Sequence, residues 1–309
     1  MKLFYYRYPE GSSNFGDHLN PWLWEQLLPD ILDEDENTIF VGIGTVLNSD
    51  LLPKAHRTAV FSSGVGYGTL PKVESSWSIY CVRGPLSAQA LGVRNELAVT
   101  DGAILVRRLF NTTNRKVTRF AYMPHYSHAE YGGQTWNSIC KDLGFGYIDP
   151  RWPVEQVLSS INQTEILLTE AMHGAIVADA FRVHWIPINT GPHILDFKWQ
   201  DWCLSVDVEY QPRYISPPHL RLPWSRPGKK RYAAVWEEQP PEIGVRSSVR
   251  HWVKKKLVAA QLNHIAKTSP PTLSSDTRIE QLTVELEERL QQFRDDVAAG
   301  YFHHYKFDD

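Results

Sequence analysis

Two residues of the sequence, Arg83 and His173, are of types that bind anions or transfer protons. Each lies where a predicted β-strand is followed by a predicted helix. Arg83 follows an apolar strand, and Pro85, two residues later, suits the first turn of a helix. His173 opens the helix predicted over 174–181, after a strand predicted over 165–169. The amides of a helix start and the fork of an arginine both favour phosphate or carboxylate, and a histidine there can exchange a proton near neutral pH. The two positions therefore predict an anion-binding and acid/base site.

Each position also has a purely structural alternative. Arg83 fits a surface ion pair, and His173 fits a helix cap or a core histidine. However, the two occupy corresponding places in two predicted halves of the chain, a combination that packing alone does not require. We therefore expect Arg83 and His173 to face one cleft.

Glycine-rich turns and two histidines are further candidates. The stretch Asn14–Asp17 and the glycine loops at 42–44 and 64–68 each follow a predicted strand, where the backbone can approach a ligand. Neither glycine loop completes the GxGxxG pattern ahead of a helix, so no dinucleotide site is predicted. His125 and His128 have no carboxylate or cysteine at ligand spacing, so no metal is predicted either.

The elements that must position these residues alternate between strands and helices. The first half has predicted strands at 2–6, 38–41, 58–61, 78–82 and 97–99, and helices at 19–29, 85–91 and 102–109. After a polar stretch, the second half has strands at 119–123, 146–148, 165–169 and 184–188, and helices at 135–143, 153–161 and 174–181. This alternation is typical of βαβ units, so we predict an α/β fold with two domains, 1–115 and 116–245, and a ligand in the crevice between them.

The C-terminal region, 246–309, departs from this alternation and follows a Pro-rich stretch that begins near residue 207. A helix predicted over 276–299 carries an apolar seam, which must either dock back on the chain or form a dimer, so the oligomeric state stays open. The segment 224–270 has ten Lys or Arg residues against three Glu, a net charge of +7. It fits a solvated face or, with Trp252, contact with anionic lipid headgroups.

Composition narrows the class of protein. The 309 residues are 42% hydrophobic with a net charge of -3, which is ordinary for a globular chain, and we expect no nucleic-acid partner. Three widely spaced cysteines form neither a disulfide framework nor a zinc motif, and no export signal is present, so a cytoplasmic protein is expected. Tryptophan is abundant. Some of Trp22, Trp24, Trp199 and Trp202 are candidates to line an acceptor groove, whereas Trp185, inside a predicted strand, is expected in the core.

Taken in order, the motifs resemble those of the polysaccharide pyruvyl transferases, particularly the bacterial exopolysaccharide ketal pyruvate transferases. The matching positions are Asn14-Phe15-Gly16-Asp17, the loops containing Gly42, Gly64 and Gly66, Val82-Arg83-Gly84-Pro85-Leu86-Ser87, Val99-Thr100-Asp101-Gly102 and Met172-His173-Gly174-Ala175-Ile176. The resemblance covers residues 1 to about 205. Many members carry an arginine two residues before the histidine, where this chain has Ala171, and Lys198 is the candidate to replace that cation.

The resemblance implies two Rossmann-like halves facing a central cleft, as in GT-B glycosyltransferases. The sequence pattern adds two C-terminal helices, predicted over about 246–266 and 276–299. It implies phosphoenolpyruvate as the donor, a saccharide acceptor that is free or lipid-linked, and no cofactor or metal. His173 would be the catalytic acid/base. The donor-binding residues would be Arg83, Met172, His173, Gly174 and Lys198, and the other site candidates are Asn14, Gly16, Asp17, Gly64, Gly66, Asp101 and Glu170.

Two other functions stay open, because a fold does not fix an activity. One is a nucleotide-sugar-dependent GT-B glycosyltransferase. The other is a non-catalytic glycan-binding subunit of a polysaccharide assembly, in which His173 could be lost without consequence. Peripheral attachment to the inner membrane is the alternative to a purely cytoplasmic location.

Overall fold

A computed structural model describes residues 1–8, 13–113, 115–218 and 245–302, with the side chains of 245–251 left aside. The chain forms two parallel β-sheets with helices around them, which confirms the predicted α/β class. The first sheet has the order β1-β2-β3-β4 and the second the order β6-β5-β7-β8-β9. The strands are β1 (Lys2–Phe4), β2 (Thr38–Val41), β3 (Arg57–Phe61), β4 (Trp77–Cys81), β5 (Thr118–Met123), β6 (Gly146–Tyr147), β7 (Thr164–Thr169), β8 (His184–Asn189) and β9 (Arg213–Tyr214).

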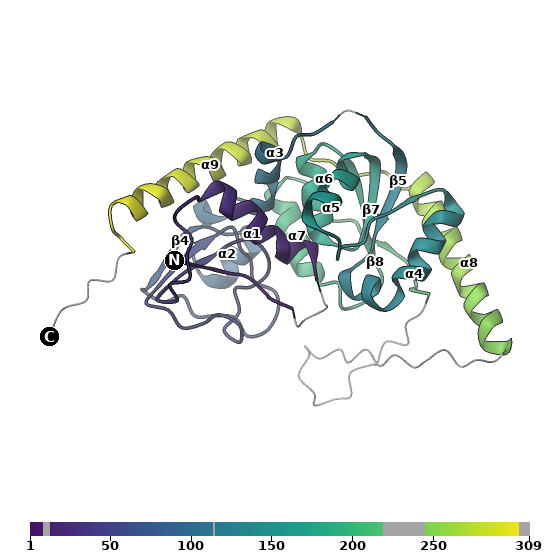
Figure 1. The fold of residues 1–309 in the computed structure, drawn as a ribbon, viewed down its shortest axis with the longest axis horizontal. Helices are drawn as coiled ribbons and strands as arrows, with labels where there is room; N and C mark the ends of the chain where they lie inside the picture. The colour runs from purple at the N-terminus through teal and green to yellow at the C-terminus, as the bar shows by residue number, and fades with distance from the viewer. Residues whose placement is uncertain (9–12, 114, 219–244, 303–309) are drawn as a thin grey trace.

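The helices connect these strands and cover the sheets (Figure 1). They are α1 (Phe15–Leu27), α2 (Pro85–Leu91), α3 (Val106–Leu109), α4 (Tyr126–Leu143), α5 (Val154–Asn162), α6 (Met172–Ala180), α7 (Asp196–Ser205), α8 (Val245–Thr268) and α9 (Asp276–Ala298), with short 3-10 turns at Asn95–Leu97 and Gly102–Leu105. Strands β2 and β3 are buried almost throughout, as expected for a parallel sheet with both faces covered. The carboxyl ends of the strands therefore carry the loops that are free to build a site.

The structure corrects several predicted elements. Residues 97–99 do not form a strand, because only Ala98 bridges to Val82 and the preceding residues form a 3-10 turn. Helix α1 begins at Phe15 rather than near residue 19, so the predicted Asn14–Asp17 loop is the cap and first turn of that helix. Helix α4 begins at Tyr126, nine residues before the predicted start at 135, and it continues through two consecutive glycines. Gly133 lies against Tyr147 and Arg151, where a side chain would crowd its neighbours, so packing outweighs the helix-breaking tendency of glycine.

The two C-terminal helices lie on different halves of the molecule (Figure 1). Helix α9 places its apolar seam against the first sheet, where Phe293 packs on Phe40 and Tyr80. Helix α8 lies against α4, and Lys255 pairs there with Asp142 at 3.0 Å. Most of the Pro-rich stretch and the basic residues between 226 and 231 lie outside the described residues.

Of the four tryptophans proposed for an acceptor groove, three are buried in the interior of the protein. Trp24, Trp199 and Trp202 have no exposed surface, and Trp185 packs with the last two. Trp22 is half-buried and donates to Glu155 at 3.0 Å, which joins α1 to α5. Fully buried indoles contribute packing energy and cannot contact an acceptor.

Candidate functional site

His173 lies in the first turn of α6, where the second sheet meets the first half of the chain. Its Nε2 is 3.6 Å from Oδ2 of Asp101, and 14% of the imidazole is exposed. Asp101 has no exposed surface, and its other carboxylate oxygen accepts from the amide of Ala103 at 3.0 Å. At this distance the buried carboxylate acts on the imidazole electrostatically, and a shift of about half an ångström would bring the pair within hydrogen-bond distance.

The first turn of α1 closes over the same imidazole. A Cβ built on Gly16 would stand 2.1 Å from Nδ1 of His173, so only glycine allows this close approach. Asp17 follows, and Asn14 donates to its carboxylate at 2.6 Å. Burial raises the pKa of Asp17, while the Asn14 hydrogen bond and the charges of His173 and Lys198 act in the opposite direction. The predicted Asn14–Asp17 motif therefore supplies a buried carboxylate that is harder to ionise than an exposed one.

Two tyrosines that the sequence did not single out complete this side of the site. Tyr8 interacts through its hydroxyl with Asp17 and with Tyr126, and the Tyr8 and Tyr126 rings pack edge to face at 5.0 Å. Burial raises the pKa of both phenols, that of Tyr126 to about 12, so both stay protonated at neutral pH. Neutral phenols near a carboxylate can donate hydrogen bonds to oxygen atoms of a ligand.

Lys198 supplies a cation close to these groups. It belongs to α7, its Nζ donates to the hydroxyl of Tyr67 at 2.9 Å, and it is half-buried. Its charge partly offsets the burial that raises the pKa of Asp17, and it adds to the burial that lowers the pKa of His125. Because Lys198 belongs to α7 and donates to Tyr67 of the first half, it lies where the two halves meet.

Glu170 organises a second cluster at the end of β7. Its side chain has no exposed surface, and its Oε2 is 2.7 Å from Nδ1 of His128. The same oxygen accepts from the amide of His125 at 2.9 Å, and Tyr122 donates to the other oxygen. Burial alone would raise the pKa of Glu170, but the charge of His128 and these hydrogen bonds lower it. The His193 ring meets the His128 ring edge to face with centroids 4.6 Å apart, and burial lowers the pKa of His193 to about 4.

The structure gives Arg83 a different partner from the predicted donor. Its side chain has no exposed surface, and its Nε donates to Oδ2 of Asp201 in α7 at 2.9 Å. The terminal nitrogens donate to Thr45 at 2.7 Å and to the carbonyl of Val65 at 2.9 Å. Asp201 also accepts from the Ser87 amide at 2.9 Å, so a carboxylate of the chain itself occupies the anion position at the start of α2. Arg83 thereby ties the two halves together.

The glycine loops make room for side chains of the protein. A Cβ on Gly64 would lie 2.3 Å from the Arg83 guanidinium, and one on Gly42 would lie equally close to Asn20 and Trp24. A Cβ on Gly66 would crowd Leu195 and Thr45 at 3.0 Å. These contacts explain the glycines without a ligand.

The remaining donor candidates beside His173 are enclosed by the fold. Met172 is buried, and the amide of Gly174 donates to the carbonyl of Ala171 at 2.9 Å. A Cβ on Gly174 would stand 2.7 Å from the sulfur of Met123. Gly174 therefore lets the first turn of α6 approach Met123 of β5, and the imidazole of His173 is the side chain of this turn that faces Asp101 and the first turn of α1.

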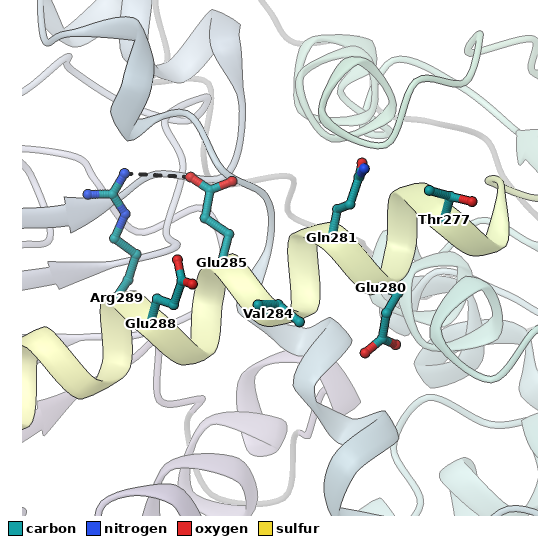
Figure 2. A pocket seen from close by; sticks show the side chains of 7 residues that line it. All are labelled: Thr277, Glu280, Gln281, Val284, Glu285, Glu288 and Arg289. Carbon is teal, nitrogen blue, oxygen red and sulfur yellow. Dashed lines mark ion pairs between the residues drawn. The ribbon is translucent and has the colours of Figure 1, made fainter.

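An open depression on α9 lies apart from these clusters (Figure 2). Its lining consists of Thr277, Glu280, Gln281, Val284, Glu285, Glu288 and Arg289. Glu285 pairs with Arg289 at 3.5 Å, and Glu280 pairs with Arg107 and Arg108 at the base of the helix. None of these residues belongs to the clusters around His173 or Glu170, so the depression is a charged outer face of α9.

Sequence reasoning missed Asp201, Tyr8, Tyr126 and His193. His193 follows β8, as Glu170 follows β7, so its place at the carboxyl end of a strand was the available signal. Asp201 gave none, because it lies inside a helix whose partner, Arg83, is 118 residues away in sequence.

Comparison with known proteins gives one extensive match. The chain is 36% identical over 327 residues to the succinoglycan biosynthesis protein ExoV of Rhizobium meliloti (strain 1021), an alignment that covers 98% of this chain and 100% of that protein. No protein-family model matches the chain. Within the described residues, no helix combines the length and the apolar character needed to cross a membrane.

Proposed function

Because the chain belongs to the exopolysaccharide-biosynthesis family of the ExoV protein, in line with the resemblance in its motifs, we propose that it is a pyruvyl transferase. It moves a pyruvyl group from phosphoenolpyruvate onto two hydroxyls of one sugar residue in an exopolysaccharide or its lipid-linked precursor. The products are a cyclic ketal and inorganic phosphate. The observation that carries the proposal is the convergence of His173, Asp101 and Asp17 from the two halves of the chain.

The reaction needs a proton donor, a base and an anion-binding group. Protonation of C3 of phosphoenolpyruvate makes C2 electrophilic, and one sugar hydroxyl adds to C2 and loses its proton. Phosphate then leaves from C2, and the second hydroxyl adds and loses its proton to close the ketal ring. The chemistry is general acid/base catalysis with stabilisation of a developing charge next to an anionic group.

The chain offers a group for each of these needs. We assign His173 as the acid/base, with Asp101 positioning its imidazole at 3.6 Å. Lys198 binds an anionic group of the donor in place of the arginine missing at Ala171. Asp17, whose pKa is raised by burial, contacts acceptor hydroxyls together with Tyr8. Arg83 acts at a distance by fixing α7, the helix of Lys198, to the loops of the first half.

The two-sheet architecture supports a GT-B-like arrangement with the site between the halves, but such an arrangement serves glycosyltransferases as well. The discriminating experiment therefore supplies the purified chain with phosphoenolpyruvate, or separately with nucleotide sugars, plus oligosaccharide acceptors of succinoglycan type. Phosphate release coupled to an acid-labile pyruvyl ketal, detected by mass spectrometry and NMR of the glycan, is the expected result. Transfer that requires a nucleotide sugar, or glycan binding without turnover, would overturn the assignment.

A matched pair of lysine variants tests the donor role in the same assay. Lys198→Met should raise the KM for phosphoenolpyruvate by about tenfold or more, because a charge-assisted contact is worth roughly 1.5–3 kcal/mol. Lys54→Met, at an exposed lysine of the first half, should leave KM unchanged. An unchanged KM in Lys198→Met would remove this residue from the donor site.

We also propose that the chain works at the cytoplasmic face of the inner membrane, where a lipid-linked acceptor would lie. Trp252, Val253 and Leu257 in α8 are each at least half exposed, and Lys254 and Lys256 lie among them. Such a mixture suits anionic headgroups. Flotation with anionic vesicles should give salt-sensitive binding that a Trp252→Ser, Lys254→Glu double variant loses, whereas equal recovery of both proteins would contradict it.

A further inference from the structure

Three side chains at the carboxyl edge of the second sheet bring metal-ligating atoms together. His128, Glu170 and His193 each offer one ligand atom, and these atoms lie within 4.8 Å of one another. The residues follow β5, β7 and β8, which are adjacent strands of this sheet. The spacing in sequence hides this cluster, because the carboxylate missing beside His128 comes from the next strand.

The burial of the cluster gives it the form of a built site. The side chains of His128 and Glu170 are 1% and 0% exposed, and His193 is half-buried at their open side. A buried carboxylate requires compensating positive charge or hydrogen bonds, and Glu170 receives them from His128, Tyr122 and the His125 amide. The glutamate is therefore held in one orientation before any ligand binds.

The distances suit a transition metal after a small adjustment. Zinc binds imidazole nitrogen at about 2.0–2.1 Å and carboxylate oxygen at about 2.0–2.2 Å, so its ligand atoms stand about 3.3–3.5 Å apart in a tetrahedral site. Nδ1 of His128 and Oε2 of Glu170 are 2.7 Å apart, which is the spacing of a shared proton. A metal would replace that proton, push the two atoms apart by less than about an ångström, and release the proton to solvent.

The ligand chemistry selects the class of metal. Two imidazoles and one carboxylate suit Zn²⁺ or a similar divalent ion, whereas Mg²⁺ and Ca²⁺ favour an all-oxygen set. The His125 ring stands 5.3 Å from His193, centroid to centroid, and its Nδ1 bonds to Ser127 at 2.7 Å. His125 thus borders the cluster without belonging to the three proposed ligands.

We propose that His128, Glu170 and His193 bind one divalent transition metal ion, with Zn²⁺ as the representative and a fourth position open to water or an anionic ligand. This proposal does not rest on the pyruvyl transfer, because it concerns metal binding by the full chain without substrate. Glu170 is three residues before His173 in the sequence, so the fourth metal position would lie near the proposed donor.

The test uses the tag-free full chain, stripped of metal and then titrated with Zn²⁺, Co²⁺ and Mg²⁺. We expect one equivalent of Zn²⁺ by calorimetry and by elemental analysis after gel filtration, a visible Co²⁺ absorption band of low-coordinate nitrogen and oxygen ligation, and no comparable binding of Mg²⁺. Zn²⁺ should also raise the thermal midpoint of unfolding, since it binds the folded chain.

Variants separate the site from adventitious histidine binding. His193→Ala, at the half-buried ligand, should fold normally and lose at least about 100-fold in Zn²⁺ affinity, and Glu170→Gln should lose the Co²⁺ band. His264→Ala, at an exposed histidine of α8, is the matched control and should bind like the unchanged chain. Less than a tenth of an equivalent of Zn²⁺ in the unchanged chain, or equal Zn²⁺ affinity in folded His193→Ala, would overturn the proposal. If the unchanged chain binds Zn²⁺ but shows no pyruvyl transfer, the result counts against the proposed function and not against the metal site.

Discussion

The starts of α2 and α6 have similar sequence patterns and different surroundings. Each follows a parallel strand and carries a basic side chain, Arg83 before α2 and His173 in α6. At α2 the guanidinium is fully enclosed, and Asp201 bonds to both the arginine and the helix amide at 2.9 Å. At α6 the imidazole keeps 14% of its surface exposed and faces Asp101 at 3.6 Å, beyond hydrogen-bond distance.

The difference indicates which charges stabilise the fold and which are available to a ligand. Every polar arm of Arg83 has a partner in the protein, so the pair contributes to joining the halves. Around His173, by contrast, a carboxylate with a raised pKa, two protonated phenols and a lysine lie close together with incomplete compensation. Functional sites keep such partly unfavourable arrangements, at some cost in stability.

The largest effect on stability is expected from Arg83→Ala. It leaves Asp201 buried without its cation, which typically costs about 3–5 kcal/mol in the free energy of unfolding. Urea denaturation followed by tryptophan fluorescence measures this loss, and Arg94→Ala, at an exposed arginine, should change it by less than about 0.5 kcal/mol. A loss below about 1 kcal/mol, accompanied by a raised KM for phosphoenolpyruvate, would show that Arg83 binds the donor. The starts of α2 and α6 would then not differ in role.

A smaller effect, on rate rather than stability, is expected from Asp101→Asn. Asparagine can still accept from the Ala103 amide, so the free energy of unfolding should change by less than about 1 kcal/mol. Its amide group can present a donor to Nε2 of His173 and favour the wrong tautomer, which should lower kcat by at least about tenfold. Steady-state kinetics beside an Asp30→Asn control check this. Full activity would mean that Asp101 does not position His173.

The smallest effect is the pH dependence that Asp17 contributes to stability. Its pKa is raised above the ordinary value of 3.8, mainly by burial, so the folded chain holds this proton more tightly than the unfolded chain. That contribution is complete below the ordinary pKa and is lost as pH rises through the raised value. Asp17→Asn should therefore gain thermal stability relative to the unchanged chain between pH 4 and pH 7, and Glu25→Gln, exposed on the same helix, should not. If the stability of Asp17→Asn relative to the unchanged chain falls as pH rises, the raised pKa of Asp17 is contradicted.

Much of the site was accessible from the sequence because local pattern and position at a strand end coincide. His173 could be singled out because it opens a helix directly after a strand, and Gly16 because it lies in a turn before a helix, whereas Asp101 was identified only through the resemblance to the family motif. The role of Arg83 could not be predicted, because burial and the partner Asp201 depend on how α7 meets the first sheet. Composition was equally silent on Trp199 and Trp202, since a buried and a groove-lining indole look alike in sequence.

The cluster around Glu170 shows again that contacts between distant parts of the chain cannot be predicted from local sequence. His128 belongs to a motif visible in the sequence, but the carboxylate and the second imidazole that give it chemical meaning come from neighbouring strands. Strand order in a parallel sheet determines which loops meet, and the order β6-β5-β7-β8-β9 is a property of the folded chain.

The central claim is that His173 performs acid/base chemistry in pyruvyl transfer, and His173→Ala tests it most directly. The measurement is kcat for phosphate release and ketal formation, made beside the free energy of unfolding, with His18→Ala on the exposed face of α1 as the control. The account predicts a loss of about 10²–10⁴-fold in kcat for both products with the unfolding free energy within about 1 kcal/mol of the unchanged chain. A folded His173→Ala enzyme that retains kcat within threefold would contradict it.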